Sequence, residues 1–444
     1  MAEAPVATWP ASPTTTLMLV ALAIFAAIAS PASTALEGLR VDLTYVDSGR
    51  NFTKLELLQR ALKRSKHRVN TLAARATLAA GAGIGGELEA PVNAGSGEFI
   101  VDLGIGTPSV PFPAILDTGS DLVWTQCKPC SSCYKQATPV FDPSASKTFA
   151  TLGCYSKLCQ ALPTSSCDLL DCVYLYSYGD YSSTQGVLAT ETFTFGSPNG
   201  VSVPDVGFGC SGYSLGDFEP AAGLVGLGRG PLSLTSQLGV GKFSYCLTKP
   251  GESKKSPLLF GSLANLSGTH AQSTPFLHNP TQATFYYLSL KGITVGPTSL
   301  RFPPTTFAIN DDGTGGVIID SGTTITYLET EGYRALRKAF VSQVKLPVGN
   351  GSEAGLDLCF QLPEGVSAER VKVPKLVFHF EGADLDLPPE NYMVPDEGSG
   401  QLCLWVMGTS GTSILGNFQQ QNFHMLYDLA GNKLAFTPAH CDQL

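Results

Sequence analysis

Two short segments, each at the end of an apolar run, constrain the fold most. Residues 113–116 (Pro-Ala-Ile-Leu) lead into Asp117-Thr118-Gly119-Ser120, and residues 317–319 (Val-Ile-Ile) lead into Asp320-Ser321-Gly322-Thr323. A short apolar run that stops at a Gly-containing segment is typical of a buried strand followed by a tight turn. A buried carboxylate is costly unless it is hydrogen-bonded or shares a proton. Two such Asp residues in one chain therefore suggest that they act together.

The chain also contains an internal repeat built around these two turns. Gly226, in a Gly-Leu-Val-Gly-Leu-Gly segment, lies 109 residues after Asp117, and Gly416, in Ile-Leu-Gly, lies 96 residues after Asp320. Each half thus has an Asp turn followed by an apolar-apolar-Gly segment. We expect two similar lobes whose Asp turns meet at their interface, with a cleft between the lobes, where ligand sites are common.

Two carboxylates held close together suit one kind of chemistry. They cannot both ionise easily, so one of them keeps a proton at acidic pH. The ionised carboxylate can take a proton from water, and the protonated one can give a proton to a substrate carbonyl. This pair predicts hydrolysis of peptide bonds by an activated water, without a metal and without a covalent intermediate.

Composition favours an all-β protein and excludes one class of partner. The chain has 444 residues, 43% of them hydrophobic, with 47 Gly, 30 Pro and few stretches of helical period, which is typical of short strands and many turns. The convincing helix starts at Glu331 and ends at about Val344, with Tyr333, Leu336 and Phe340 on one face. The net charge of −9 argues against nucleic acid as a partner.

The first 35 residues have the pattern of a signal peptide. An apolar run of thirteen residues, Leu17 to Ala29, precedes small residues that suit a cleavage site. The segment before the run carries Glu3 and no Lys or Arg, so an uncleaved membrane anchor is the alternative. We expect secretion to the extracellular space, with the vacuole as the alternative destination, and no stable membrane partner.

Residues 36–90 read as a basic pro-segment and linker in front of an acidic body. They hold nine Lys or Arg against six Asp or Glu, whereas residues 91–444 hold nineteen against thirty. Opposite charge suggests that the two parts attract each other. One or two amphipathic helices are expected, because apolar residues recur at near-helical spacing: Leu55, Leu58, Leu62, Val69 and Leu72. An Ala- and Gly-rich linker follows, and we expect acid processing between about Ala74 and Val92.

Twelve cysteines, an even number, behind a signal peptide predict disulfides, with a connectivity that the sequence alone does not fix. The run Cys127-x-x-Cys130-x-x-Cys133 leaves a zinc or iron–sulfur site as an alternative, but no fourth ligand lies at metal spacing. The six His residues show no paired metal spacing either, so we expect no metal and no cofactor. Asn265 and Asn350 are expected glycosylation sites, since both begin an Asn-x-Ser/Thr triplet.

The two Asp turns carry a family resemblance. Residues 115–120 with Trp124, and residues 318–323, resemble the two active-site turns of pepsin-like aspartic proteases, and Tyr178-Gly179-Asp180 is similar to the tip of that family's flap. The similarity spans about residues 98–444. The cysteine-rich stretch from Gln126 to Cys133, followed by Phe141 to Ser146, resembles the insertion of plant nepenthesin-type enzymes.

The resemblance implies a fold and a set of site residues. It implies an all-β, bilobal, pepsin-like fold of two β-barrel-like lobes, 91–262 (with a Cys-rich insertion 127–172) and 263–444. Asp117 and Asp320 would hold the catalytic water, supported by Thr118, Gly119, Ser120, Ser321, Gly322 and Thr323. Tyr178 would close over substrate, its phenol linked to the Trp124 indole. Thr118 and Ser321 would each reach across to the opposite lobe.

The same resemblance implies the disulfide pairing. The expected pairs are Cys127–Cys130, Cys133–Cys210, Cys154–Cys172, Cys159–Cys167, Cys246–Cys441 and Cys359–Cys403.

Function then follows as an expectation. The chain is predicted to be a secreted aspartic endopeptidase, made as a zymogen, monomeric, active at acidic pH, with its own pro-segment and protein or peptide substrates as partners. The alternative is a catalytically inactive binding protein on the same fold, such as a glycosidase inhibitor. Both Asp turns and the flap Tyr are intact, which favours the enzyme.

Overall fold

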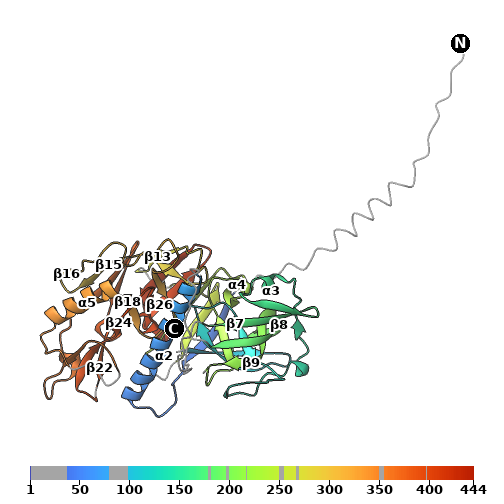
Figure 1. Ribbon diagram of the computed structural model, residues 1–444, viewed down its shortest axis with the longest axis horizontal. Helices are drawn as coiled ribbons and strands as arrows, with labels where there is room; N and C mark the ends of the chain where they lie inside the picture. The colour runs from blue at the N-terminus through green and yellow to red at the C-terminus, as the bar shows by residue number, and fades with distance from the viewer. Residues whose placement is uncertain are drawn as a thin grey trace. The chain divides into compact units, whose positions relative to one another are not determined.

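The computed structural model describes Met1 and residues 38–79, 99–178, 182–196, 200–216, 218–249, 255–266, 270–349, 355–396 and 398–444. The chain divides into two units, Met1–Glu37 and Gly38–Leu444, and everything below concerns the second (Figure 1). The predicted signal peptide and most of the predicted processing region lie outside the described residues.

Strands dominate the described part of the first half of the chain. Alternating burial, as in β7 and β8, shows the period-2 pattern of strands that face a core on one side. The bounds are β1 Gly38–Tyr45, β2 Phe99–Ile105, β3 Val110–Asp117, β4 Trp124–Gln126, β5 Ala150–Thr151, β6 Ser165–Asp168, β7 Asp171–Ser177, β8 Ser183–Phe195, β9 Val201–Leu215, β10 Gly223–Gly226, β11 Lys242–Cys246 and β12 Ser256–Gly261.

The second half continues the same architecture. Its strands are β13 Gln272–Leu277, β14 Tyr287–Leu288, β15 Leu290–Val295, β16 Thr298–Ser299, β17 Val317–Ile319, β18 Thr326–Glu329, β19 Cys359–Gln361, β20 Leu376–Phe380, β21 Ala383–Leu387, β22 Met393–Asp396, β23 Gln401–Leu404, β24 Val406–Thr409, β25 Ser413–Leu415, β26 Phe423–Asp428 and β27 Lys433–Pro438. Twenty strands of the described chain join one hydrogen-bonded sheet, and smaller sheets are formed by β16-β15-β20-β21 and β19-β23-β22.

Helices are few and mostly short, so the all-β prediction is confirmed. They are α2 Lys54–Ala79, α3 Lys157–Gln160, α4 Leu234–Leu238, α5 Thr330–Gln343 and α6 Asn417–Gln420, with 3₁₀ turns η1 Pro143–Ala145, η2 Ala368–Arg370, η3 Pro389–Asn391 and η4 Cys441–Gln443. Helix α5 agrees with its predicted bounds to within about a residue, and buries Tyr333, Leu336 and Phe340. None of the helices in the described ranges is both long and apolar enough to span a bilayer.

Two separate hydrophobic cores support the two halves. One lies wholly within residues 100–232 and is built around Trp124, Tyr174 and Tyr178. The other combines second-half residues, among them Ile318, Tyr327 and Trp405, with apolar side chains of α2: Leu58, Ala61, Leu62, Val69 and Leu72. Helix α2 is therefore packed as part of the second core.

The predicted internal repeat is confirmed by strand pairing. Strand β3 pairs in parallel with β10, which sets Gly226 opposite Asp117, and β17 pairs in parallel with β25. A Cβ atom on Gly226 would lie 2.3 Å from the Asp121 carbonyl carbon, and one on Gly416 would lie 2.5 Å from that of Ile325. Glycine at both positions therefore lets the backbone after each Asp turn approach its partner strand.

The basic segment that the sequence predicts to be a pro-segment contributes a strand as well as a helix. Strand β1 pairs antiparallel with β12 over six residues and with β2 over three, so it is inserted between two strands of the body. It is followed by α2, a single helix, drawn as the long blue ribbon in Figure 1. The sequence predicted the helix but not this strand.

The disulfide pairing agrees with the predictions in two of six bridges. Cys246–Cys441 and Cys359–Cys403 form as expected. The predicted pairs Cys127–Cys130 and Cys133–Cys210 are wrong, because the structure joins Cys127 to Cys210 and Cys130 to Cys133. Parallel pairing of β4 with β9 sets Thr125 opposite Cys210, which brings the Cα atoms of Cys127 and Cys210 to 5.4 Å.

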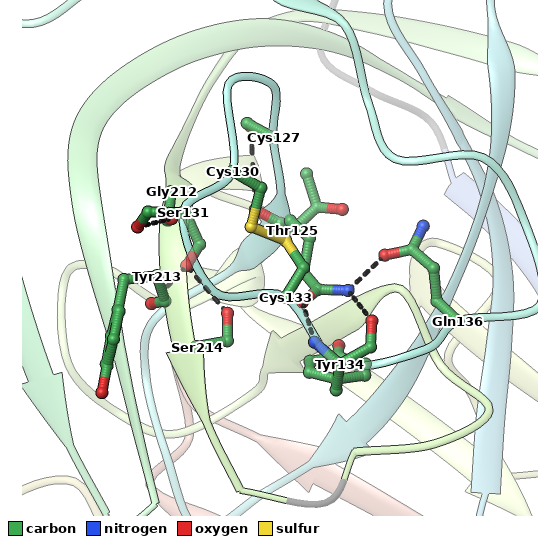
Figure 2. Close-up of a disulfide and its surroundings, with 12 residues drawn as sticks. Thr125, Cys127, Cys130, Ser131, Cys133, Tyr134, Gln136, Gly212, Tyr213 and Ser214 are labelled. Atoms are coloured by element: carbon green, nitrogen blue, oxygen red, sulfur yellow. Dashed lines mark hydrogen bonds between the residues drawn. A yellow bond between two sulfur atoms is a disulfide. The ribbon is translucent and has the colours of Figure 1, made fainter.

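Cys130 and Cys133 then close a small loop of their own, shown in Figure 2. The Ser131 backbone N–H and side-chain hydroxyl both donate to the Gly212 carbonyl, each at 2.9 Å, and this holds the loop against β9. All three cysteines of the run are thus committed to disulfides, so they do not serve as thiolate ligands.

The predicted pairs Cys154–Cys172 and Cys159–Cys167 are also wrong. The structure joins Cys154 to Cys167 and Cys159 to Cys172. Burial explains the choice: Cys159 and Cys172 both lie in the first-half core, whereas Cys167 is exposed and Cys154 only half-buried. Sequence spacing does not reveal which face each cysteine presents.

Candidate active site

The two predicted turns lie at the ends of buried strands. Asp117 is the last residue of β3, Asp320 directly follows β17, and neither side chain is exposed. Ile115, before the first turn, belongs to the first-half core, and Ile318, before the second turn, belongs to the second-half core. The local sequence pattern and the local structure agree at both positions.

Each Asp accepts hydrogen bonds from its own turn. Asp117 Oδ1 accepts from the Gly119 N–H at 2.9 Å, and Asp117 Oδ2 accepts from the Ser120 hydroxyl. Asp320 repeats the pattern with the Gly322 N–H at 3.1 Å and the Thr323 hydroxyl at 2.6 Å. Donors of this kind stabilise the ionised form of a carboxyl group.

Direct contacts link the two turns across the halves. The Thr118 hydroxyl donates to Asp320 Oδ1 at 3.4 Å and accepts from the Ser321 N–H at 2.9 Å. Ser321 does not mirror this: among the residues that the structure describes, its buried hydroxyl has no hydrogen-bond partner. The expectation of a symmetrical pair of cross-links therefore fails at Ser321.

A cation from helix α2 occupies the space between the carboxylates. Arg68, on α2, is 1% exposed. Its Nε donates to Asp320 Oδ2 at 2.9 Å and its Nη1 to Asp117 Oδ2 at 3.3 Å. Its Nη2 contacts Asp117 Oδ1 and, at 3.2 Å, Asp320 Oδ1. One nitrogen atom therefore touches an oxygen of each Asp at once.

The charges in this cluster shift the pKa values of Asp320 and Arg68. Burial alone would raise the pKa of Asp320, but the Arg68 charge and the hydrogen bonds from Arg68, Thr323 and Gly322 outweigh it and lower the pKa below its usual range. Burial would likewise lower the pKa of Arg68, yet Asp117 and Asp320 together raise it. Arg68 therefore carries its positive charge inside the protein.

The two glycines of the turns make room for this contact. A Cβ atom on Gly119 would lie 2.3 Å from Arg68 Nη2, and one on Gly322 would lie 3.3 Å from both the guanidinium carbon and Asp117 Oδ1. Side chains here would push Arg68 away and crowd the carboxylates.

Tyr178 and Trp124 form the predicted pair. The Trp124 indole N–H donates to the Tyr178 hydroxyl at 2.8 Å, and Tyr178 is 5% exposed, against Tyr176 and Phe218. Tyr178 follows β7, and its N–H donates to the Ser182 carbonyl, which continues the hairpin into β8. Gly179 and Asp180, the rest of the predicted flap tip, lie outside the described residues.

Sequence reasoning missed Arg68 as a site residue. Arg68 is buried together with the apolar residues Leu58, Leu62 and Leu72 of α2. A charged residue within an apolar stripe was the available signal. Asp121 was also missed: its carboxylate accepts from the Gly230 N–H at 2.8 Å and from the Thr284 hydroxyl at 2.7 Å, which adds a link between the halves.

The two Asp side chains are arranged so that they can activate a water molecule held between them. Arg68 Nη2 marks a position within hydrogen-bond reach of both Oδ1 atoms. A water in that position would touch both carboxylates, and one ionised and one protonated Asp would serve as base and acid.

Known proteins match this chain over nearly its whole length. Aspartic proteinase nepenthesin-1 from Nepenthes gracilis is 48% identical over 411 residues, covering 91% of this chain and 90% of the relative. Nepenthesin-2 from the same plant is 46% identical over 444 residues, covering 96% and 98%. The chain belongs to the nepenthesin-type aspartic proteinases. It is an aspartic-type endopeptidase by that membership.

Two family models match the halves of this nepenthesin-type chain. They are described as xylanase inhibitor N-terminal (residues 99–262) and xylanase inhibitor C-terminal (residues 285–438). Among solved structures, that of edgp has a TM-score of 0.68 at 19% identity, covering 93% of this chain and 97% of the other. Soybean basic 7S globulin has a TM-score of 0.61 at 23% identity, covering 78% and 95%. These likenesses show the pepsin-like bilobal fold alone.

The remaining predicted sites stay predictions. Asn265 is exposed, and its carbonyl oxygen accepts from Lys242 Nζ at 2.5 Å, whereas Asn350 lies outside the described residues. Within the described ranges, no group of three His, Cys, Asp or Glu side chains is placed to hold a metal ion.

Proposed function

We propose that the chain is the zymogen of a secreted endopeptidase that works at acidic pH, with Asp117 and Asp320 as the catalytic pair. One observation carries this proposal: Arg68 of the pro-segment contacts both carboxylates and fills the position that a catalytic water needs. The full-length chain is then inactive because its own cation neutralises the pair.

The rest of the pro-segment supports the same function. The Ser65 hydroxyl accepts from the Ile325 N–H at 2.9 Å, and the Ala61 carbonyl accepts from the Thr324 hydroxyl at 3.3 Å. Both body residues lie just after Asp320, where an extended substrate would need backbone partners. Helix α2 therefore covers the second-half wall of the cleft.

Acid would release the pro-segment from the catalytic pair. Protons that neutralise the carboxylates remove the attraction that holds Arg68, and the freed pair then cuts the linker after α2. Secretion is supported by the apolar run from Leu17 to Ala29 and by the disulfides that engage all twelve cysteines. We propose delivery to the apoplast, with the vacuole as the alternative, and action as a monomer.

The competing function is a protease-like binding protein, and the descriptions of the two matching family models favour it. The intact turns argue against it, since both Asp, both Gly and the hydroxyl donors Ser120 and Thr323 make the contacts that an active pair needs.

Acid hydrolysis of denatured globin separates the two. The acid-treated protein is expected to cut globin, and a pepstatin-like transition-state mimic is expected to block the cut. The Asp117→Ala precursor is expected to stay full-length under the same conditions. Stable globin with the wild-type protein, or undiminished maturation of Asp117→Ala, would contradict the proposal.

A further inference from the structure

A cavity of about 400 Å³ lies beside α2, between the pro-segment and the second half of the chain. Leu57, Leu58 and Ala61 of α2 form one side of it. The body supplies the opposite side, which includes Asp396, Trp405 and Phe418. The predicted catalytic residues do not line this cavity, so it is a separate feature.

Two buried polar groups in the wall lack partners. Asp396, at the end of β22, is 2% exposed, and its Oδ2 accepts no hydrogen bond from any described residue. Trp405, after β23, is also 2% exposed, and its indole N–H finds no acceptor within the described chain. Buried polar groups are normally paired, because leaving them unpaired costs free energy. Both residues line the cavity, so its wall contains one acceptor and one donor that have no described partner.

The charge and the apolar surface of the cavity wall indicate which class of ligand would fit. Lys249 and Glu390, also in the wall, pair with each other at 3.4 Å, so Asp396 leaves the site with an excess of negative charge. Trp405 stacks on Phe418 with ring centroids 4.8 Å apart. A cation on an aliphatic stem fits both features, since its stem packs on apolar surface while its head reaches a carboxylate. The Trp405 N–H in turn needs a carbonyl. A peptide segment that carries Lys or Arg supplies both groups.

The cavity lies close in sequence to the Asp320 turn. Thr324, four residues after Asp320, lies in its wall and donates to the Ala61 carbonyl of α2. Departure of the pro-segment removes the side formed by α2 and leaves the body residues open. We propose that in the mature enzyme Asp396 and Trp405 form an extended substrate pocket for a Lys or Arg side chain, remote from the scissile bond. This inference rests on the proposed endopeptidase function.

Substrate series on the acid-matured wild-type protein test the pocket first. Otherwise identical peptides carry Lys, norleucine or Glu at each position flanking the cut, and kcat/KM is measured at the upper end of the active pH range, where exposed carboxylates are ionised. At one position, Lys is expected to exceed norleucine by about tenfold, the scale of a charge-assisted hydrogen bond, with Glu the poorest. Equal rates for Lys and norleucine at every position would overturn the inference.

A matched pair of variants assigns the preference to Asp396. Asp396→Asn is expected to reduce the Lys-to-norleucine ratio to about one while leaving the norleucine rate unchanged, which also shows that the variant is folded. The control is Asp386→Asn, at an exposed Asp paired with Lys375, and it is expected to keep the ratio. A ratio unchanged in Asp396→Asn would overturn the assignment. Cleavage without any preference refutes the pocket alone, whereas absence of all cleavage also refutes the proposed function.

Discussion

At the scale of single residues, Arg68 is held between the two carboxylates by charge. A fully buried guanidinium is tolerated here because two buried carboxylates neutralise it and accept its hydrogen bonds. While α2 is packed in place, loss of one partner alone would leave a buried charge uncompensated. The strength of this contact makes it a switch that depends on protons.

The direction of the pH effect follows from Asp320. Its pKa in the full-length chain is depressed, so its ionised form stabilises the docked pro-segment above the ordinary Asp value, and that stabilisation is lost as pH falls through the depressed value. Pulsed hydrogen exchange should show α2 protected at neutral pH and unprotected in strong acid.

Arg68→Met should weaken this protection at neutral pH and flatten its pH dependence, because the cation that depresses the pKa is gone. Lys63→Met, at an exposed position of the same helix, is the control and should behave as wild type. An unchanged pH profile in Arg68→Met would show that another contact holds the segment.

The residues of the turns could be predicted from sequence, whereas Arg68 and four of the six disulfides could not. Asp117 and Asp320 each follow an apolar run and precede Gly, a local pattern that strand and turn geometry reproduce. Arg68 acts through a contact 49 residues away from Asp117 and 252 away from Asp320, which no local pattern encodes. The Cys127–Cys210 bridge likewise depends on the pairing of β4 with β9.

At the scale of elements, the segment after β1 and helix α2 are joined to each other by ion pairs, in addition to their contacts with the rest of the chain. Asp47, after β1, is buried and pairs with Arg60 at 2.9 Å and with Arg64 at 2.8 Å, both on α2. The Arg60 guanidinium also lies 4.4 Å from the Phe52 ring centroid. This cluster sets the angle between strand and helix, and so directs Arg68 toward the carboxylates.

Asp47→Asn should therefore loosen the pro-segment without touching the catalytic pair. The variant is expected to mature faster than wild type, and at a higher pH, because two cations lose their buried partner. Intact-mass measurements across a pH series would follow the conversion. Asp42→Asn, at a half-exposed Asp whose nearest cation is Arg40 at 3.9 Å, should mature like wild type. Equal maturation of Asp47→Asn and wild type would contradict this role of the Asp47 ion pairs.

Strand β1 was missed although its sequence carried a signal. Leu39, Val41 and Leu43 alternate with polar residues, the period expected of a half-buried strand, and all three are buried. The basic helix next to it has the longer and stronger sequence pattern. Its pairing with both β2 and β12 is a long-range choice that the alternation alone does not specify.

At the scale of the whole molecule, the two halves of the chain are joined by pairing of β11 with β26 and by the Cys246–Cys441 bridge. This bridge closes a loop with a sequence separation of 195, whereas Cys130–Cys133 spans only 3. Chain entropy makes the longer closure the more stabilising.

Replacement of Cys246 and Cys441 by Ala should lower the free energy of unfolding by about 4–5 kcal/mol, against about 1–2 kcal/mol for the Cys130 and Cys133 pair. Chemical denaturation of the two double variants at neutral pH would measure both. Equal losses would show that the bridge between β11 and the C-terminal end does not act through loop closure.

The central claim is that Asp117 and Asp320 work as one catalytic unit, and mature single and double Asn variants test it most directly. With each pro-segment removed by added wild-type enzyme, which is then inactivated and separated, kcat/KM is measured on one peptide. We expect kcat/KM of each single variant to fall by at least about a thousandfold. The double variant is expected to lose no more than the worse of the two single variants, because the effects of groups that share one water are not additive. A single variant that keeps a tenth of the wild-type rate, or a double variant whose loss is the product of the two single losses, would contradict the account.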